Sequence, residues 1–212
     1  ESAETLKRLE DLYLPFKPKR QSRASGARER GLEPLAALIW SGAPEVADLN
    51  AAAAPFVNAE KELPGTVEVL QGAADILAEN ISEEAALRET CRQLAWRTGK
   101  LVGTPTKAGS EKGHEYRDYF EFSESVSKIP PHRVLAINRG EKSGALRIKF
   151  EWDDAAVSQS SEAHYRWDSH PHREFLKTCL TDALSRLSDQ LLRHGERPSR
   201  TMPRRAPGLP GA

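Results

Sequence analysis

The positions of hydrophobic residues along this chain predict a mostly helical protein. Apolar side chains recur every three or four positions over residues 66–81, 83–98 and 171–193. This spacing places them on one face of an α-helix, so we predict amphipathic helices over these three ranges. We expect Leu94 and Leu184 to be core residues on their helices. Proline and glycine delimit shorter predicted helices at residues 2–13, 34–42, 50–54 and 132–139.

Residues 145–152 follow a different pattern, in which apolar residues alternate strictly with charged ones. Leu146, Ile148 and Phe150 alternate with Arg147 and Lys149. Alternation with a period of two predicts a half-buried strand. A shorter strand is suggested at residues 100–102, whereas residues 153–170 look polar and irregular. The predicted fold class is therefore mainly α: an elongated helical domain with helix-turn-helix-like packing and one short β element.

The two ends of the chain and its cysteines bear on its class and location. Residues 196–212 are rich in proline and arginine and have almost nothing to bury, which predicts a disordered tail. The chain opens at Glu1 instead of Met, which indicates a missing N-terminus. No apolar run approaches the roughly 20 residues that span a bilayer. Cys91 and Cys179 fall among apolar helix positions, as free thiols of a reducing cytoplasm do.

The charge of the chain makes any nucleic-acid contact a local matter. Lys and Arg number 31, as do Asp and Glu, so the formal net charge is zero. The most basic stretch, an extended loop predicted at residues 14–30, holds six cations and one acid, with Tyr13 and Phe16 at its entrance. Cations bind phosphates and aromatic rings stack on bases. The candidate nucleic-acid-binding residues are Lys17, Lys19, Arg20 and Arg23. The alternative is that the arginines of this loop pair with acids elsewhere in the chain.

Other clusters of reactive side chains favour structural roles. Residues 164–172 contain His164, Asp168, His170 and His172, but they lack the spacing of known metal sites and any cysteine. Asp168 and His170 are better suited to cap the helix predicted from Pro171. The sequence has no serine-nucleophile, zinc-protease, phosphate-loop or paired-cysteine motif. We therefore expect no enzymatic activity, no cofactor, no metal and no small-molecule substrate.

Several long strings, in the same order, resemble the bacterial Tex family of transcription accessory proteins. They are LEDLYLPFKPKR (Leu9–Arg20), ARERGLEPLA (Ala27–Ala36), ADILAENISE (Ala74–Glu83), YRDYFEFSE (Tyr116–Glu124) and IPPHRVLAINRGEKSGALRIK (Ile129–Lys149). The resemblance extends from about residue 5 to residue 152, and TCLTDALSRL (Thr178–Leu187) continues it more weakly.

The resemblance implies a fragment of a much longer protein. Members of this family are described as elongated helical proteins with helix-turn-helix, RNase H-like, helix-hairpin-helix and C-terminal RNA-binding OB-fold modules. They resemble the core of a eukaryotic elongation factor of the Spt type. Residues 1–152 then correspond to the N-terminal helical region. Residues 153–195 form a linker and a long helix leading toward a missing RNase H-like module, and residues 196–212 form the tail, which departs from the family pattern.

The function implied is that of a cytoplasmic helical scaffold segment in transcription or RNA metabolism. Its expected partner is nucleic acid, RNA in preference to DNA. The competing class is a protein–protein docking platform, for example on RNA polymerase, without direct nucleic-acid contact. Binding to RNA or DNA that weakens steeply with salt would distinguish the two, because phosphate contacts release counterions.

Overall fold

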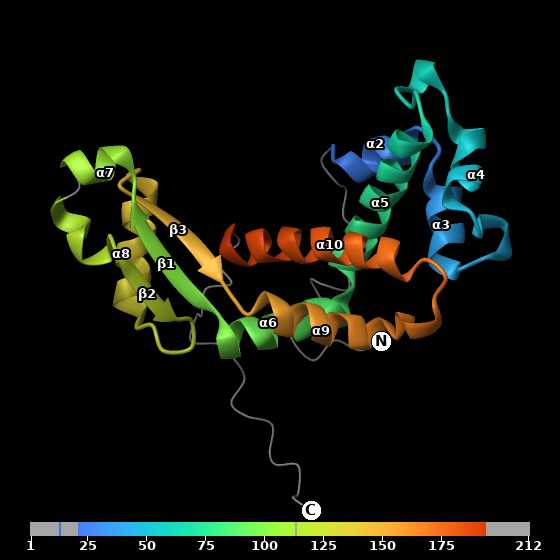
Figure 1. The fold of residues 1–212 in the computed structure, drawn as a ribbon. Helices are drawn as coiled ribbons and strands as arrows, with labels where there is room; N and C mark the ends of the chain where they lie inside the picture. Colours follow the sequence, from blue (N-terminus) through green and yellow to red (C-terminus); the bar gives the residue numbers. More distant parts are fainter. Residues whose placement is uncertain (1–12, 14–20, 113, 194–212) are drawn as a thin grey trace, which may run out of the picture. The chain divides into compact units, whose positions relative to one another are not determined.

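The computed structural model of the chain describes residues 13, 21–112 and 114–193 (Figure 1). The tail at residues 196–212 and all but Tyr13 of the helix predicted at 2–13 lie outside the described residues. The chain divides into two compact units. The helical unit comprises Glu1–Cys91 and Asp154–Leu187, and the sheet unit comprises Arg92–Asp153 and Ser188–Ala212. The boundaries predicted at residues 152 and 195 rest on the family resemblance and stay a prediction.

The helical unit is built mainly from α-helices and short 3-10 turns. Its elements are α2 (Arg23–Glu29), α3 (Glu33–Ser41), η2 (Pro44–Val46), α4 (Leu49–Ala53), η3 (Ala54–Phe56), η4 (Ala59–Lys61), α5 (Thr66–Glu83), the start of α6 (Ala85–Thr98), α9 (Asp154–Tyr165), η6 (Trp167–Ser169) and α10 (Arg173–Arg193) as far as Leu187. The predictions at 66–81, 83–98 and 171–193 are confirmed by α5, α6 and α10, and the mainly α fold class is confirmed with them.

Helix α5 is the central element of the helical unit, with contacts to α2, α3 and α4. Its apolar positions recur at helical spacing, so Val69, Ala73, Ile76 and Leu77 are all buried. Gly72 allows a close approach, because a Cβ at that position would lie 2.3 Å from Leu32 Cδ1. The largest fully buried side chains of this unit include Leu32, Leu35, Ile39, Ile76, Leu77, Ile81, Leu87, Leu176 and Leu180.

The structure replaces part of the predicted 14–30 loop with a helix. Helix α2 begins at Arg23 because Ser22 and Ser25 form a reciprocal capping box, each side chain accepting a backbone N–H of the other. Only Ala24 and Ala27 are buried on α2. With no large apolar residue, this helix has too weak a periodic pattern to be recognised in the sequence.

Helix α9 was also missed, since residues 153–170 were predicted to be irregular. It buries Val157 and Ser161, which are four positions apart but give almost no apolar signal. The start predicted at residue 83 for the next helix was slightly early as well. Ser82 lies inside α5, where its hydroxyl donates to the carbonyl of Glu79, and α6 begins only at Ala85.

Of the two predicted core leucines, one is confirmed. Leu184 is buried on α10, whereas Leu94 is only half-buried on α6. The buried positions of α6 include Leu87, Cys91 and Ala95, which follow one another at intervals of four residues. Leu94 lies beside this stripe instead of on it.

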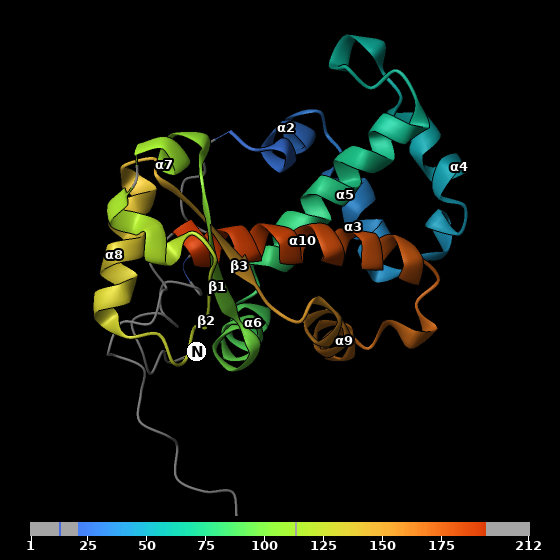
Figure 2. The same ribbon diagram turned by 60° about the vertical axis from the view of Figure 1, so that its left-hand side comes forward.

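The sheet unit contains a three-stranded antiparallel sheet, whereas the predicted fold class had one short β element. Its elements are the end of α6, β1 (Lys100–Pro105), α7 (Lys107–Lys112), η5 (His114–Tyr119), β2 (Phe122–Ser125), α8 (Pro131–Lys142) and β3 (Leu146–Glu151). The strand order is β2-β1-β3, and α8 packs along β3 (Figures 1 and 2). β3 confirms the strand predicted at 145–152, and the shorter strand suggested at residues 100–102 is confirmed by β1. β2 was missed because four residues are too few to show a period.

The sheet separates a core face from a solvent face. Leu101, Phe122, Leu146 and Ile148 are buried on one side, where they form a hydrophobic core with Ile137 of α8. The residues between them point the other way, because successive side chains of a strand alternate between faces. Alternation in β3 therefore places Arg147 and Lys149 opposite the core, as the sequence pattern predicts. The predicted helix-turn-helix-like packing and elongated form stay predictions.

Candidate nucleic-acid interface

The four candidate nucleic-acid-binding residues divide between described and undescribed parts of the chain. Lys17, Lys19 and Arg20 lie outside the described residues. Arg23 is the first residue of α2, in the helical unit, and its side chain is 63% exposed. Among the described residues of this segment, Arg23, Arg28 and Arg30 are the arginines that could bind phosphate.

Arg23 belongs to a network of two arginines and two aspartates. Its Nε lies 3.4 Å from Asp75 Oδ1, and its Nη2 lies 3.4 Å from Asp182 Oδ2. The same two carboxylates bind Arg186, whose Nη2 lies 3.1 Å from Asp75 Oδ1 and 2.5 Å from Asp182 Oδ2. Two positive and two negative charges balance, so Arg23 is compensated within the protein.

Arg28 and Arg30 are also paired with acids. Arg28 forms an ion pair with Glu79 on α5, and its Nη2 donates to Asn80 Oδ1 at 2.8 Å. Arg30 Nη2 lies 2.8 Å from Glu62 Oε2. Each of the three arginines within residues 21–30 thus pairs with a carboxylate elsewhere in the chain, which is the alternative that the sequence left open.

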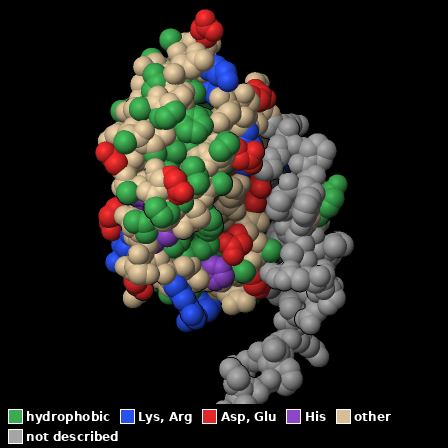
Figure 3. All heavy atoms as spheres, turned by 90° about the vertical axis from the view of Figure 1, so that its right-hand side faces the viewer, with side chains coloured by type: hydrophobic (Ala, Val, Ile, Leu, Met, Phe, Trp, Pro, Cys, Tyr) green, Lys and Arg blue, Asp and Glu red, His purple; other side chains and the backbone are tan. Residues whose placement is uncertain are grey.

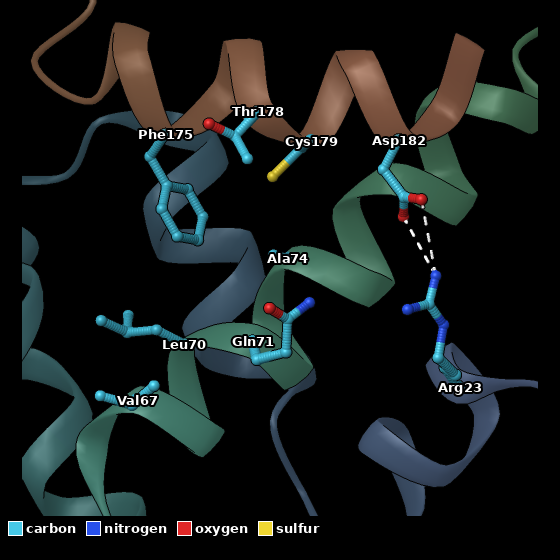
Figure 4. A pocket seen from close by; sticks show the side chains of 9 residues that line it. All are labelled: Arg23, Val67, Leu70, Gln71, Ala74, Phe175, Thr178, Cys179 and Asp182. Carbon is cyan, nitrogen blue, oxygen red and sulfur yellow. Dashed lines mark hydrogen bonds and ion pairs between the residues drawn. The ribbon is translucent and has the colours of Figure 1, made fainter. Parts of the chain in front are cut away.

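A pocket of about 360 Å³ lies next to Arg23, between α5 and α10 (Figure 4). It is lined by Arg23, Val67, Leu70, Gln71, Ala74, Phe175, Thr178, Cys179 and Asp182. Burial, followed in importance by the charge of Asp182, raises the pKa of the Cys179 thiol to about 12. A thiol that holds its proton is neither a nucleophile nor a metal ligand. The lining is largely apolar and its charged pair is balanced, so this pocket does not suit a phosphate.

The histidines near α10 have structural partners. His170 Nδ1 accepts a hydrogen bond from the backbone N–H of His172 at 3.1 Å, and its Nε2 lies 3.2 Å from the carbonyl oxygen of Trp40. Asp168 Oδ1 lies 3.5 Å from Arg173 at the start of α10. His164 Nε2 lies 2.9 Å from Glu84 Oε1. Within the described ranges, no group of three or more His, Cys, Asp or Glu residues is arranged to hold a metal ion.

The two units differ strongly in charge. Residues 21–91 and 154–187 of the helical unit contain nine Lys and Arg against seventeen Asp and Glu, a formal net charge of −8. Residues 92–153 of the sheet unit contain twelve Lys and Arg against eight Asp and Glu, a formal net charge of +4. The net charge of zero for the whole chain is therefore the sum of a basic sheet unit and an acidic helical unit. Counting charges by unit could have shown this from the sequence, had the unit boundaries been known.

The helical unit also exposes hydrophobic side chains. Leu38 and Trp40 of α3 and Val57 after η3 each have more than a third of their surface exposed. Residues 31–60, which include all three, contain no Lys, Arg or His. Figure 3 shows hydrophobic side chains gathered in the middle of the face over α3 and α4. Residues 31–60 thus contribute no cation to this face, and the Lys and Arg side chains visible in Figure 3 lie outside its hydrophobic middle.

Among the described helices, none combines the length and the hydrophobicity that crossing a bilayer requires.

Comparison with known proteins places the chain in a family. A family model described as Tex central region-like matches residues 45–193. The chain is 43% identical over 148 residues to Protein tex of Bordetella pertussis, covering 70% of this chain and 18% of that protein. It is 38% identical over 164 residues to the Transcriptional accessory protein Tex of Neisseria gonorrhoeae, covering 76% and 21%.

A human protein gives a more distant match. The S1 RNA-binding domain-containing protein 1 of Homo sapiens is 24% identical over 206 residues, covering 90% of this chain and 20% of that protein. The chain thus spans about a fifth of the length of the curated relatives that it matches. The family match includes α9 and α10 as well as both parts of α6, so it covers most of both units. This chain belongs to the Tex central region-like family.

Proposed function

We propose that this chain is a non-enzymatic, cytoplasmic scaffold segment of a Tex-like transcription accessory factor, and that it binds nucleic acid, RNA in preference to DNA. The observation that carries the proposal is the basic character of the sheet unit, +4 over residues 92–153. Two of the relatives support the setting, since one is named a transcriptional accessory protein and another an S1 RNA-binding domain-containing protein.

Binding by this chain should be weak and tolerant of sequence. Recognition of specific bases needs side chains that reach base edges, whereas cations on a surface bind the phosphate backbone alone. The affinity should therefore fall steeply as salt rises, because each phosphate contact releases counterions. The test is a titration of the isolated chain with a single-stranded RNA of mixed sequence at several salt concentrations. Absence of binding at low salt would refute the proposal.

The same assay tests the candidate residues of the N-terminal segment. Lys17, Lys19, Arg20 and Arg23 are changed together to Ala, and a matched control removes four tail arginines, Arg197, Arg200, Arg204 and Arg205. If the N-terminal segment binds RNA, the first variant binds RNA more weakly and its affinity depends less steeply on salt concentration, whereas the control is unchanged. Arg23→Ala alone should have little effect, because Asp75 and Asp182 already compensate that arginine.

The second candidate function is a docking platform for another protein, for example RNA polymerase. It is favoured by the exposed Leu38, Trp40 and Val57, which lie in a segment without cations (residues 31–60), since exposed apolar patches mark protein interfaces. A pull-down with purified RNA polymerase tests it. Leu38→Glu should abolish binding, and Val67→Glu, which adds the same charge at an exposed site of α5, should not. Equal binding by both variants and the parent chain would exclude this face.

A further inference from the structure

Three cations of the sheet unit lie on one face of its sheet. The register of β1 and β3 pairs Thr104 with Arg147, Val102 with Lys149, and Lys100 with Glu151. These six residues alternate with those that point into the hydrophobic core, such as Leu101 and Ile148. Lys100, Arg147 and Lys149 therefore project together from the solvent face, which we call the basic sheet face.

The cations of the basic sheet face are exposed and lack internal partners. The side chains of Lys100, Arg147 and Lys149 are all exposed. Within the part of the chain that the structure describes, none of the three forms an ion pair. This is the opposite of Arg23, Arg28 and Arg30, each of which contacts a carboxylate. Glu151 is the one acid that the three strands place on this face.

The spacing of these cations brings like charges close together. Residues two apart in a strand, such as Arg147 and Lys149, are separated by roughly 7 Å. Lys149 and Lys100 are diagonal neighbours on adjacent strands, whose Cβ atoms lie about 7–8 Å apart. Both separations are within a Debye length at physiological salt, about 8 Å. Neighbouring cations in the row Arg147, Lys149 and Lys100 therefore repel each other. Glu151, directly opposite Lys100, offsets part of this charge, and the positive charge that remains would be neutralised by an anion with several negative groups.

Hydroxyl groups border the cations. Thr104 of β1 and Ser123 and Ser125 of β2 occupy the same face, because Ser123 pairs with Val102 and Ser125 with Lys100. Hydroxyls donate to phosphate oxygens and exchange hydrogen bonds with the ribose 2′-OH, the group that distinguishes RNA from DNA. The three strands place no aromatic ring on this face, so base stacking is not part of the site.

We propose that the basic sheet face binds the sugar–phosphate backbone of single-stranded RNA, through Lys100, Arg147 and Lys149. The inference rests on the proposed nucleic-acid binding and assigns it to a surface. The competing explanation is that cations protect exposed strand edges against aggregation. That would account for Arg147 and Lys149, since β3 is an edge strand, but not for Lys100, which lies on the central strand β1.

The experiment compares two variants of the full chain that lose the same charge. The sheet variant carries Lys100→Gln, Arg147→Gln and Lys149→Gln. The control carries Lys107→Gln, Arg139→Gln and Lys142→Gln, three exposed cations on α7 and α8, with the same residue types and the same unit. Circular dichroism and thermal unfolding check that both variants fold. Affinity is measured with oligouridylate and with its deoxy counterpart as the probes, over a range of salt.

The expected result is a loss of at least tenfold in affinity for oligouridylate in the sheet variant at low salt. The slope of log affinity against log salt concentration should become less steep by about two, because each of the three lost phosphate contacts with a single strand removes about 0.7. The affinity of the control variant should stay within about twofold of that of the parent chain, because its substitutions remove no phosphate contact. If the sheet variant does not fold, Lys149→Glu alone is the second test, with Lys142→Glu as its control.

The other outcomes separate this inference from the proposed function. A parent chain that binds no RNA overturns both. A parent that binds while the sheet variant is unchanged overturns the assignment to this face and leaves the proposed function standing. Equal losses in the sheet variant and its control also overturn the assignment, since charge alone would then explain binding. Equal affinity for both probes overturns the preference for RNA.

Discussion

The ion-paired arginines of the helical unit and the unpaired cations of the basic sheet face have opposite roles, although the sheet unit also pairs Arg133 with Glu124. In the helical unit, Arg23, Arg28, Arg30 and Arg186 contact carboxylates, so the cations hold elements together and the surplus charge is negative. In the sheet unit, three exposed cations share one face of the sheet. The difference teaches that a basic stretch in a sequence is weak evidence for phosphate binding until its acidic partners are known. The cations with no partners are the better candidates.

The largest expected effects concern the two hydrophobic cores. Leu176 of α10 and Ile137 of α8 are fully buried, one in each unit. Changing either to Ala should lower the free energy of unfolding by about 2–5 kcal/mol, because a cavity replaces packed atoms. Hydrogen exchange by mass spectrometry locates the loss. We expect Leu176→Ala to weaken protection in the helical unit and Ile137→Ala to weaken it in the sheet unit. Loss throughout the chain in both variants would show one cooperative body instead.

The next effect concerns the ion-pair network of the helical unit. The Asp75 side chain is 9% exposed and contacts both Arg23 and Arg186. Asp75→Asn should lower the free energy of unfolding by about 1–3 kcal/mol, because two arginines lose a buried charged acceptor. The control is Glu62→Gln, whose carboxylate is exposed and pairs with Arg30. Exposed pairs contribute about 0–1 kcal/mol. Denaturant titration measures both, and equal losses would mean that burial of Asp75 has no importance.

A pH effect is expected from His172 in the helical unit. His172 is buried, and no described group bonds its Nε2. Burial, followed by repulsion from His170, lowers the pKa of His172. Below a pH of about 6.5 the unfolded chain therefore takes up a proton that the folded chain resists. Stability is lost as pH falls, by up to about 1.4 kcal/mol per pH unit.

Thermal unfolding from pH 7.5 to 5 measures this dependence. His172→Leu should flatten it, and His132→Leu, at an exposed position of α8, should not. An unchanged profile in His172→Leu would mean that another group is responsible.

The smallest effect is one of reactivity instead of stability. Both cysteines, Cys91 and Cys179, are buried in the helical unit, so their labelling reports the opening of that unit alone. The raised pKa of Cys179 leaves little thiolate at pH 8. We expect slow reaction with a disulfide reagent in the native chain, accelerated by Leu176→Ala and not by Ile137→Ala. Acceleration by both would show that the units do not open separately.

The sequence by itself determined the elements with a strong local period. Helices α5, α6 and α10 and strand β3 follow from the spacing of apolar residues along the chain. Their side chains must be buried on one face, and that requirement acts within a few turns or a single strand. The alternation in β3 likewise suffices to assign Arg147 and Lys149 to its solvent face. Elements without large apolar side chains, α2 and α9, gave too little signal.

Only the tertiary structure decided which charges meet. Arg23 and Asp182 are 159 residues apart in the chain, and Arg23 is compensated only because α2, α5 and α10 pack together. In the same way, Lys100 lies near Lys149 because β1 pairs with β3, although α7, η5, β2 and α8 separate the two strands in the sequence. Pairings between distant residues depend on the packing of the whole core, which no local pattern encodes. The sequence thus marked where the cations are, and the fold decided which of them are left without an acid.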